Sequence, residues 1–468
     1  MHFLVHVNPH NAEVRQSMKY CPNFCRRPAA IGLLLFFTLL NVHSIFAQGA
    51  EKAVSLPAAW KIVREKNYSV QELQNRIQQA QQEISILKTQ FLPVVAVRQL
   101  YNYVSKVAQV EVPIPLPGVN PFTIQAGVKN QYDMAILIKQ PVFTGFRTRN
   151  LVLAGTEQKR IWQLQKTILL HKLYLQTGQL YYAIQLNVLE QRVLVQSIQR
   201  AGDQLENVRN LFRAHQAIQF DTLEVANRRL AIQNQLKKLK NFHQILLGKF
   251  RFLLNISESI SSPDITANSL KLKVKSQAFY EQLALKNRPE IQQLTGVQRA
   301  QSFRKKAIRS AFFPQIYANA AYHYARPGVN FFKNQWMKYA TIGVNAQWQL
   351  WNWGQTRHQM EKSELEIQRI GLQRLQLQNQ IRQEIVEACQ YLQNAKEQIL
   401  LQKKLVLQER KRFNLIKNKY AQGLATNTDV SSAEKALTTA ELLLQKDKID
   451  WFHYRLQLDY AAGVIGQK

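Results

Sequence analysis

The feature that most constrains the fold is an internal repeat: the chain carries the same series of motifs twice, roughly 210 residues apart. Near-constant spacing over so long a period indicates a tandem duplication and not a short-period solenoid. Each copy reads helix, strand, loop, strand, helix, helix. We therefore divide the chain into an N-terminal segment 1–47, a first unit 48–250, a linker 251–275 and a second unit 276–468. The paired motifs are Phe91-Leu92-Pro93 with Phe312-Phe313-Pro314, Gln140 to Gly145 with Gln349 to Gly354, Phe220 to Leu223 with Thr428 to Ser431, and Leu246-Leu247-Gly248 with Ala461-Ala462-Gly463.

The apolar spacing in both units predicts long coiled-coil hairpins. No proline occurs from Phe146 to Arg213 or from Trp353 to the end of the chain, and a helix of roughly 65 residues spans on the order of 100 Å. Two such helices joined at a short turn, as around Gly423, form an antiparallel hairpin. A compact globular domain fits less well, because ordinary helices average about three turns. Apolar residues step by four and three, the spacing of a coiled-coil seam, at Leu73, Ile77, Ala80, Ile84, Leu87 and Phe91, at Ile381, Ile385, Ala388, Leu392, Ala395 and Ile399, and at Val430, Ala433, Leu437, Ala440 and Leu444.

Four segments between the helices alternate apolar and polar residues, which predicts β-strands. Strands of about ten residues that are apolar on one side match membrane-spanning strands, with tyrosines near their ends as an aromatic girdle. A soluble sheet packed on a core is the alternative. Four strands cannot close a barrel, so subunits must associate, and three copies leave more room for a channel than two. The apolar sets are Val95, Val97, Tyr101 and Tyr103; Tyr132, Met134, Ile136 and Ile138; Ile316, Ala318, Ala320, Tyr322 and Tyr324; and Ala340, Ile342, Val344, Ala346, Trp348 and Leu350.

The N-terminal segment has the layout of a secretory signal peptide. Arg26 and Arg27 precede an apolar run from Ile31 to Leu40 that is too short to span a bilayer. Met18 is an alternative start to Met1. Once the signal is removed only Cys389 remains, so no intrachain disulfide is expected, and no cysteine follows the apolar run closely enough for a lipid anchor.

Charge and motifs exclude several functional classes. Lysine and arginine exceed aspartate and glutamate by 32, which invites nucleic acid as a partner. The basic residues are spread along helical polar faces, for example at Arg228, Lys237 and Arg410, without an aromatic stacking pattern. Together with secretion, this favours solvated faces and no nucleic-acid partner. No nucleotide loop, metal helix or cysteine pair is present, and the ten histidines are scattered, so we expect no enzyme, no cofactor and no metal site.

In order and duplication, these motifs resemble the TolC family of outer-membrane efflux proteins from about Ala58 to Gly463. The most specific stretches are Ala284 to Glu290, Gln140 to Gly145, and Lys419-Tyr420-Ala421-Gln422-Gly423 leading to Asp429. The resemblance implies an α+β membrane protein, mostly α: a homotrimer with a twelve-strand barrel in outer-membrane lipid and a helical tunnel through the periplasm. It implies a channel that passively conducts substrates in tripartite efflux or type I secretion. An inner-membrane pump and a periplasmic adaptor would be its partners. Whether the cargo is a drug, a metal ion or a protein is left open.

The resemblance also implies a periplasmic gate at the hairpin turns. Asp221 and Tyr420 match a linking aspartate and tyrosine, Asp429 matches a pore acid, and Gly423 marks a hairpin turn. Capping of a helix N-terminus is an alternative role for the two aspartates. The chain departs from the family pattern at Ala425, at Ser432, and at residues 214–218, which lack the turn glycine. The competing function is a periplasmic coiled-coil adaptor or scaffold, which would share the hairpins but need no membrane strands.

Overall fold

We describe the fold from a computed structural model of the chain, which describes residues 52–113, 115, 118, 121–257, 260–261, 272 and 274–467. The expected signal peptide and most of the expected linker lie outside these residues. Everything that follows concerns the unit formed by residues 51–468.

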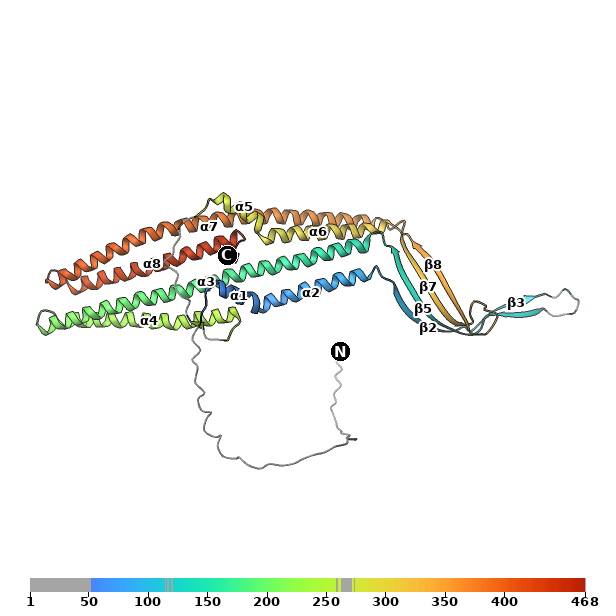
Figure 1. Cartoon of the computed structure of the whole chain (residues 1–468), viewed down its shortest axis with the longest axis horizontal. Coiled ribbons are helices and arrows are strands. Elements are labelled where there is room, and N and C mark those ends of the chain that lie inside the picture. The colour runs from blue at the N-terminus through green and yellow to red at the C-terminus, as the bar shows by residue number, and fades with distance from the viewer. Residues whose placement is uncertain are drawn as a thin grey trace, which may run out of the picture. The chain divides into compact units, whose positions relative to one another are not determined.

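Two helical hairpins dominate the structure (Figure 1). The first joins α3 (Arg147–Arg213) to α4 (Gln219–Leu254), and the second joins α7 (Gln355–Ala421) to α8 (Asn427–Ala461). α3 and α7 each have 67 residues, so each is about 100 Å long. The predicted long, proline-free helices and their hairpins are therefore confirmed.

The two hairpin turns have the same backbone conformation but different residues at the left-handed position. Gly423 has a φ of +73°, and the N–H of Leu424 donates to the Lys419 carbonyl at 2.9 Å. This is the left-handed ending that glycine favours after a helix. In the first hairpin His215 takes this place with a φ of +59°, and the N–H of Gln216 donates to the Leu211 carbonyl at 2.8 Å. The turn without glycine therefore has the same hydrogen-bonded form.

Four shorter helices complete two layers around α3 and α7. They are α1 (Leu56–Lys66), α2 (Tyr68–Thr89), α5 (Gln277–Asn287) and α6 (Pro289–Arg309), and a 3-10 turn, η1 (Ser310–Phe312), follows α6. Near the sheet the order of packing is α2, α3, α6, α7; toward the hairpin turns it is α4, α3, α8, α7. The two long helices thus run through both layers.

The predicted coiled-coil seam of α7 is buried throughout, whereas Leu444 on α8 and Leu73, Ala80 and Leu87 on α2 are half-buried. Four residues of the α7 seam are fully buried: Ile381, Ile385, Leu392 and Ile399. On α8, Val430, Ala433 and Leu437 are almost completely buried. The α7 seam belongs to a larger apolar cluster that includes Trp451 and Leu458 of α8. Phe91, the last residue of the seam expected in the first helix, lies beyond the end of α2 and is exposed.

One antiparallel sheet contains the four predicted strands. They are β2 (Val94–Tyr103), β5 (Asn130–Phe143), β7 (Gln315–Arg326) and β8 (Met337–Gln347), in the order β2-β5-β7-β8. β8 ends three residues before the predicted end at Leu350. Its last residue, Gln347, pairs with Gln315, the first residue of β7, and the preceding Pro314 has no N–H to continue the ladder.

Two small pairs of strands were not predicted. The loop between β2 and β5 contains a hairpin of β3 (Ala108–Val112) and β4 (Phe122–Ala126). β1 (Lys52–Ala53) pairs in parallel with β6 (Ile260–Ser261). β6 lies inside the expected linker.

The end of the first unit also differs from the sequence prediction. α4 continues past Gly248 and past the boundary at residue 250, and ends at Leu254. Asn255 then adopts a φ of +53°, the conformation that Gly463 adopts after α8 with a φ of +70°. Gly248 was matched to Gly463 in the sequence, but it is an ordinary helical residue with open space beside it.

Exchange of each glycine for alanine should separate these two roles. Gly463→Ala should destabilise the protein by about 2 kcal/mol, because a left-handed backbone disfavours a side chain and the new Cβ would lie 3.0 Å from the Arg288 nitrogen. Gly248→Ala should be neutral or stabilising by up to about 1 kcal/mol. Thermal unfolding followed by circular dichroism measures both, and equal melting temperatures would contradict the assignment.

Candidate functional site

The strand register collects the apolar residues of all four strands on one face of the sheet. Ile136 of β5 lies opposite Val97 of β2 and Tyr322 of β7, and Tyr322 lies opposite Ala340 of β8. Directly paired residues share a face, so the four alternating sets predicted from the sequence form one surface. The opposite face carries Asp133, Asn319, His323, Asn345 and Gln347, with a few apolar residues among them.

The apolar face is open to its surroundings. Val97 is 81% exposed, Ile342 88% and Val344 72%, so no helix of the described chain covers this face. β8 has 11 residues, which is about 37 Å of strand, or roughly 26 Å of height at the tilt typical of membrane-spanning strands. That height matches the apolar band of such strands.

Aromatic rings border the apolar face at both ends. At the loop end Tyr132 contacts Tyr101 and Trp336, and Trp336 stacks on Tyr324 with ring centroids 4.6 Å apart. At the helix end Trp348, Trp351 and Trp353 are exposed. Tyrosine and tryptophan favour the boundary between apolar chains and water. The face therefore has the layout of a surface in contact with lipid.

The sheet has two unpaired edges. Within the described chain no strand pairs with the outer edge of β2 or with that of β8. The N–H and C=O groups along these edges need partners in lipid, where water cannot supply them.

The polar face contains one charged cluster. Asp133 accepts a hydrogen bond from the Arg98 guanidinium at 2.9 Å, and its other oxygen lies 2.9 Å from Nδ1 of His323. The cluster joins three adjacent strands, β2, β5 and β7. It places charge on the side of the sheet that faces away from the apolar surface.

Two further features concern the described residues as a whole. None of the described helices combines the length and apolarity needed to cross a bilayer. Nor do three His, Cys, Asp or Glu side chains in the described part of the chain gather where they could hold a metal ion.

At the hairpin turns, each of the two predicted gate aspartates accepts a hydrogen bond from the backbone N–H of the residue that precedes its own helix. Asp429 accepts from the N–H of Thr426 at 2.9 Å and from its hydroxyl at 2.7 Å, and Thr426 accepts from the N–H of Asp429. This is a capping box. Asp221 accepts from the N–H of Ile218 at 3.3 Å, which is half of the same arrangement. Each aspartate is the third helical residue and not the cap itself.

Tyr420 lies between the two hairpins, as the gate hypothesis requires. It packs on Phe413 and Val430 of its own hairpin and on the Leu205 cluster of the first hairpin. Burial and the nearby Asp221 carboxylate raise the pKa of the Tyr420 hydroxyl. The aspartate and the tyrosine are thus close enough to interact electrostatically, and the gate role itself stays a prediction.

A buried amide near the turns was missed by the sequence analysis. Asn427 is 2% exposed. Its Nδ2 donates to Glu224 at 3.0 Å and to the Asp221 carbonyl at 3.4 Å, and its Oδ1 accepts from Gln204 at 3.2 Å. These bonds join α8 to both helices of the first hairpin. Asn427 lies two residues before Asp429, so its place directly after the turn was the only available signal.

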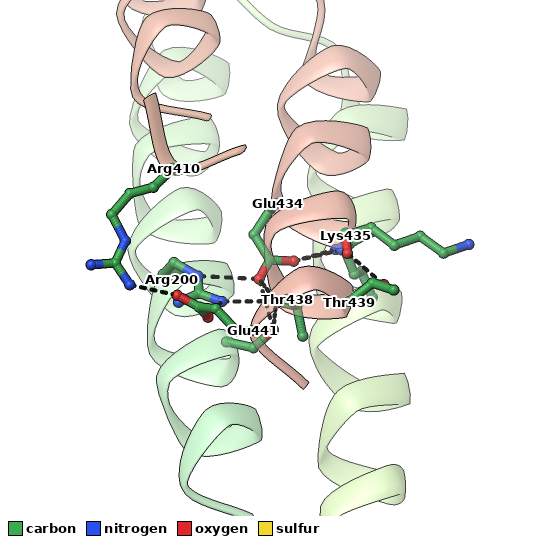
Figure 2. Close-up of polar contacts among 9 residues, drawn as sticks. Arg200, Arg410, Glu434, Lys435, Thr438, Thr439 and Glu441 are labelled. Atoms are coloured by element: carbon green, nitrogen blue, oxygen red, sulfur yellow. Dashed lines mark hydrogen bonds and ion pairs between the residues drawn. The ribbon is translucent and has the colours of Figure 1, made fainter. Parts of the chain in front are cut away.

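A buried charged cluster, which we call the latch, joins the hairpins further from the turns (Figure 2). Glu434 of α8 accepts from Ser197 at 2.7 Å and from Arg200 at 3.2 Å, both on α3, and from Nε of Arg228 on α4 at 3.2 Å. Thr438 donates to the same carboxylate at 2.6 Å. Glu434 is 4% exposed. All its polar partners but one come from the other hairpin.

Glu441 extends the latch to a fourth helix. It lies 3.1 Å from Nη2 of Arg200 and 2.8 Å from Nη2 of Arg410 on α7. The expectation of purely solvated basic faces is therefore wrong for Arg228, which is half-buried, whereas Arg410, Lys237, Lys238 and Lys240 are exposed as expected. A sequence signal existed: Glu434, Thr438 and Glu441 step by four and three along α8, in parallel with the buried seam.

Hydrogen bonds keep Glu434 ionised in spite of its burial. Burial by itself would raise its pKa, but the hydroxyls of Thr438 and Ser197 and the Arg228 guanidinium lower the pKa below the ordinary value of 4.5. At a pH above that ordinary value, the ionised carboxylate therefore stabilises the contact between the hairpins. This contribution is lost as the pH falls through the lowered pKa of Glu434.

A protein-family model matches part of the sequence, and several solved structures match the fold. A family model described as outer membrane efflux protein matches residues 281–464. Over this range the chain is similar to outer membrane efflux proteins. The resemblance to TolC-type proteins is thereby confirmed, and the second unit carries the match. No curated protein sequence matches the chain.

Solved structures of outer-membrane channels share the fold of this chain. VceC from Vibrio cholerae is 14% identical with a TM-score of 0.69, and the match covers 87% of this chain and 96% of that one. CusC is also 14% identical, with a TM-score of 0.75 and coverage of 87% and 92%. The open state of MtrE from Neisseria gonorrhoeae is 14% identical, with a TM-score of 0.66 and coverage of 88% and 90%.

The gate hypothesis can be tested at Tyr420 and Asp221. Tyr420→Phe combined with Asp221→Ala should raise the open probability of the protein in a planar bilayer several-fold, because both changes remove polar groups between the hairpins. Tyr391→Phe on the exposed side of the same helix is the matched control. If the double variant opens no more often than the control, the gate assignment is refuted.

The latch makes a prediction about pH. Glu434→Gln should weaken the contact between the hairpins by about 2–4 kcal/mol, because it leaves Arg228 without its buried countercharge and Arg200 with Glu441 alone. The wild-type protein should open as the pH falls from the ordinary carboxyl pKa through the lowered pKa of Glu434, whereas Glu434→Gln should be open at neutral pH and lack this acid step. Conductance as a function of pH measures both. Glu397→Gln, on the exposed side of α7, should behave like the wild type; loss of the acid step in this control would point to another carboxylate.

Proposed function

We propose that this chain is one subunit of an outer-membrane channel that passively conducts substrates of a tripartite efflux or type I secretion system. The observation that carries the proposal is the four-stranded sheet, which has an exposed apolar face, aromatic borders and two unpaired edges. The sheet continues directly into helices about 100 Å long. Such a subunit would form one sector of a wall around a pore.

A homotrimer is the assembly that suits this sector. Four strands per chain leave edges that lipid does not tolerate, and pairing of β2 with β8 of a neighbouring copy would satisfy them. Two copies would close eight strands, whose interior fills with side chains, whereas three copies close twelve and leave room for passage. The polar face with its Asp133 cluster would then line the pore.

The location follows from the same surfaces. We place the sheet in outer-membrane lipid, with the strand loops outside the cell and the helical hairpins in the periplasm. The alternative of a periplasmic adaptor or scaffold leaves the exposed face of the sheet without a role. The family match likewise supports the channel subunit over the adaptor.

The chain supplies no chemistry of its own in this proposal. Energy and substrate choice would come from an inner-membrane pump, joined through a periplasmic adaptor at the hairpin turns. Apolar side chains are exposed at these turns, with Ile218 and Phe220 in the first hairpin and Leu424 in the second. Exposed apolar groups of this kind are typical of contacts between proteins.

Adjacent residues of β8 provide a direct test. Ile342 is on the apolar face and Thr341 is on the polar face. Ile342→Arg should cost about 2–4 kcal/mol in the middle of the bilayer and sharply reduce the amount of assembled protein in the outer membrane, whereas Thr341→Arg should assemble and alter conductance. The measurements are extraction with detergent, the mass of the extracted particle and planar-bilayer conductance. A wild-type protein that is soluble without detergent, or a particle of one chain, would contradict the proposal.

A further inference from the structure

A cavity lies where the sheet meets the helical layer, between the start of α3 and the end of α6. Its volume is about 600 Å³, and its side chains come mainly from three basic and three aromatic residues: Arg149, Lys306 and Arg309 with Phe146, Phe303 and Phe313. The two elements meet closely here. Gly145 has a φ of +61°, and a Cβ on it would lie 2.7 Å from the Ser310 carbonyl oxygen. The glycine thus allows the approach that forms the cavity.

The charge of the cavity is entirely positive. No acidic residue lines it, and in the described part of the chain no carboxylate forms an ion pair with Arg149, Lys306 or Arg309. All three side chains are exposed. Three uncompensated cations around one hollow complement an anionic ligand.

An apolar path of rings connects the cavity to the lipid-facing surface. Phe143 pairs with Ile316 on the apolar face, and its ring contacts Phe146 edge to face at 5.4 Å. Phe146 in turn contacts Phe313 at 6.5 Å. The Trp348 indole donates to the carbonyl of Phe312 at 3.1 Å, which places an interfacial tryptophan beside the cavity.

The place of the cavity in the subunit keeps it accessible after assembly. α3 and α6 are the two inner helices of the layer α2, α3, α6, α7. Neighbouring copies would pair along β2 and β8, at the edges of the sheet. A ligand could therefore approach the cavity from the surrounding membrane.

We propose that this cavity binds the phosphate-bearing head group of an anionic phospholipid from the periplasmic leaflet of the outer membrane, with the acyl chains against the apolar face. The proposal rests on the membrane placement proposed above. The basic side chains bind the phosphate, and the phenylalanine rings contact the first carbons of the acyl chains. Such a lipid would fix the height of the subunit at the point where strands become helices.

Native mass spectrometry of the detergent-solubilised oligomer tests the proposal. Phosphatidylglycerol should bind the wild type at least tenfold more tightly than phosphatidylcholine, a difference of about 1.4 kcal/mol. The combined variant Arg149→Gln, Lys306→Gln, Arg309→Gln should lose this preference. The control variant Lys237→Gln, Lys238→Gln, Lys240→Gln removes the same charge from α4 and should keep it.

Three outcomes would overturn the lipid site. They are equal binding of both lipids by the wild type, an unchanged preference in the cavity variant, and displacement of phosphatidylglycerol by millimolar inorganic phosphate, which would indicate a free-phosphate site. The outcome is separable from that of the proposed function. A channel that conducts and assembles but shows no lipid preference refutes only the site, whereas a wild type without conductance or oligomer refutes the function.

Discussion

In the proposed membrane placement, backbone hydrogen bonding in lipid is the constraint on which the rest of this structure depends. Every N–H and C=O group in hydrocarbon needs a partner, and within the described residues the four-stranded sheet of one chain has two open edges. A single copy therefore cannot be stable in a bilayer. The requirement extends from the sheet to the helices, because strand pairing between copies would also fix how neighbouring helical layers meet. Oligomerisation is in this sense a condition for the fold of the sheet in the membrane.

The two predicted repeat units carry different residues where they touch each other. Arg200 and Arg228 of the first hairpin meet Glu434 of the second, so the ion pairs that cross between the hairpins join cations of the first half to a carboxylate of the second. A buried ion pair adds little net stability, because desolvation offsets the attraction. It does penalise strongly any arrangement in which the charges are separated. The latch therefore serves mainly to define how the hairpins align, and its hydroxyl partners keep the carboxylate ionised.

The residues that end the long helices also differ between the two halves. Gly423 and His215 both end a long helix in the left-handed conformation, although only glycine does so without a steric cost. Gly463 and Asn255 differ likewise. Residue identity alone is thus a weak guide to the equivalence of positions in the two halves, as the helical location of Gly248 shows. The hydrogen bonds of the turn are a better guide, since they are retained where the glycine is lost.

The sequence by itself determined the elements whose causes are local. The step of four and three from Ile381 to Ile399 predicted the buried seam, the absence of proline predicted the lengths of α3 and α7, and the alternation in β5 and β8 predicted an apolar face. Only the tertiary structure decided how these elements meet. The register that aligns Val97, Ile136 and Ala340 on one surface, the bond between Ser197 and Glu434, and the cavity beside Gly145 all join residues distant in the sequence. Such contacts depend on packing and charge complementarity across the fold, which no local periodicity encodes.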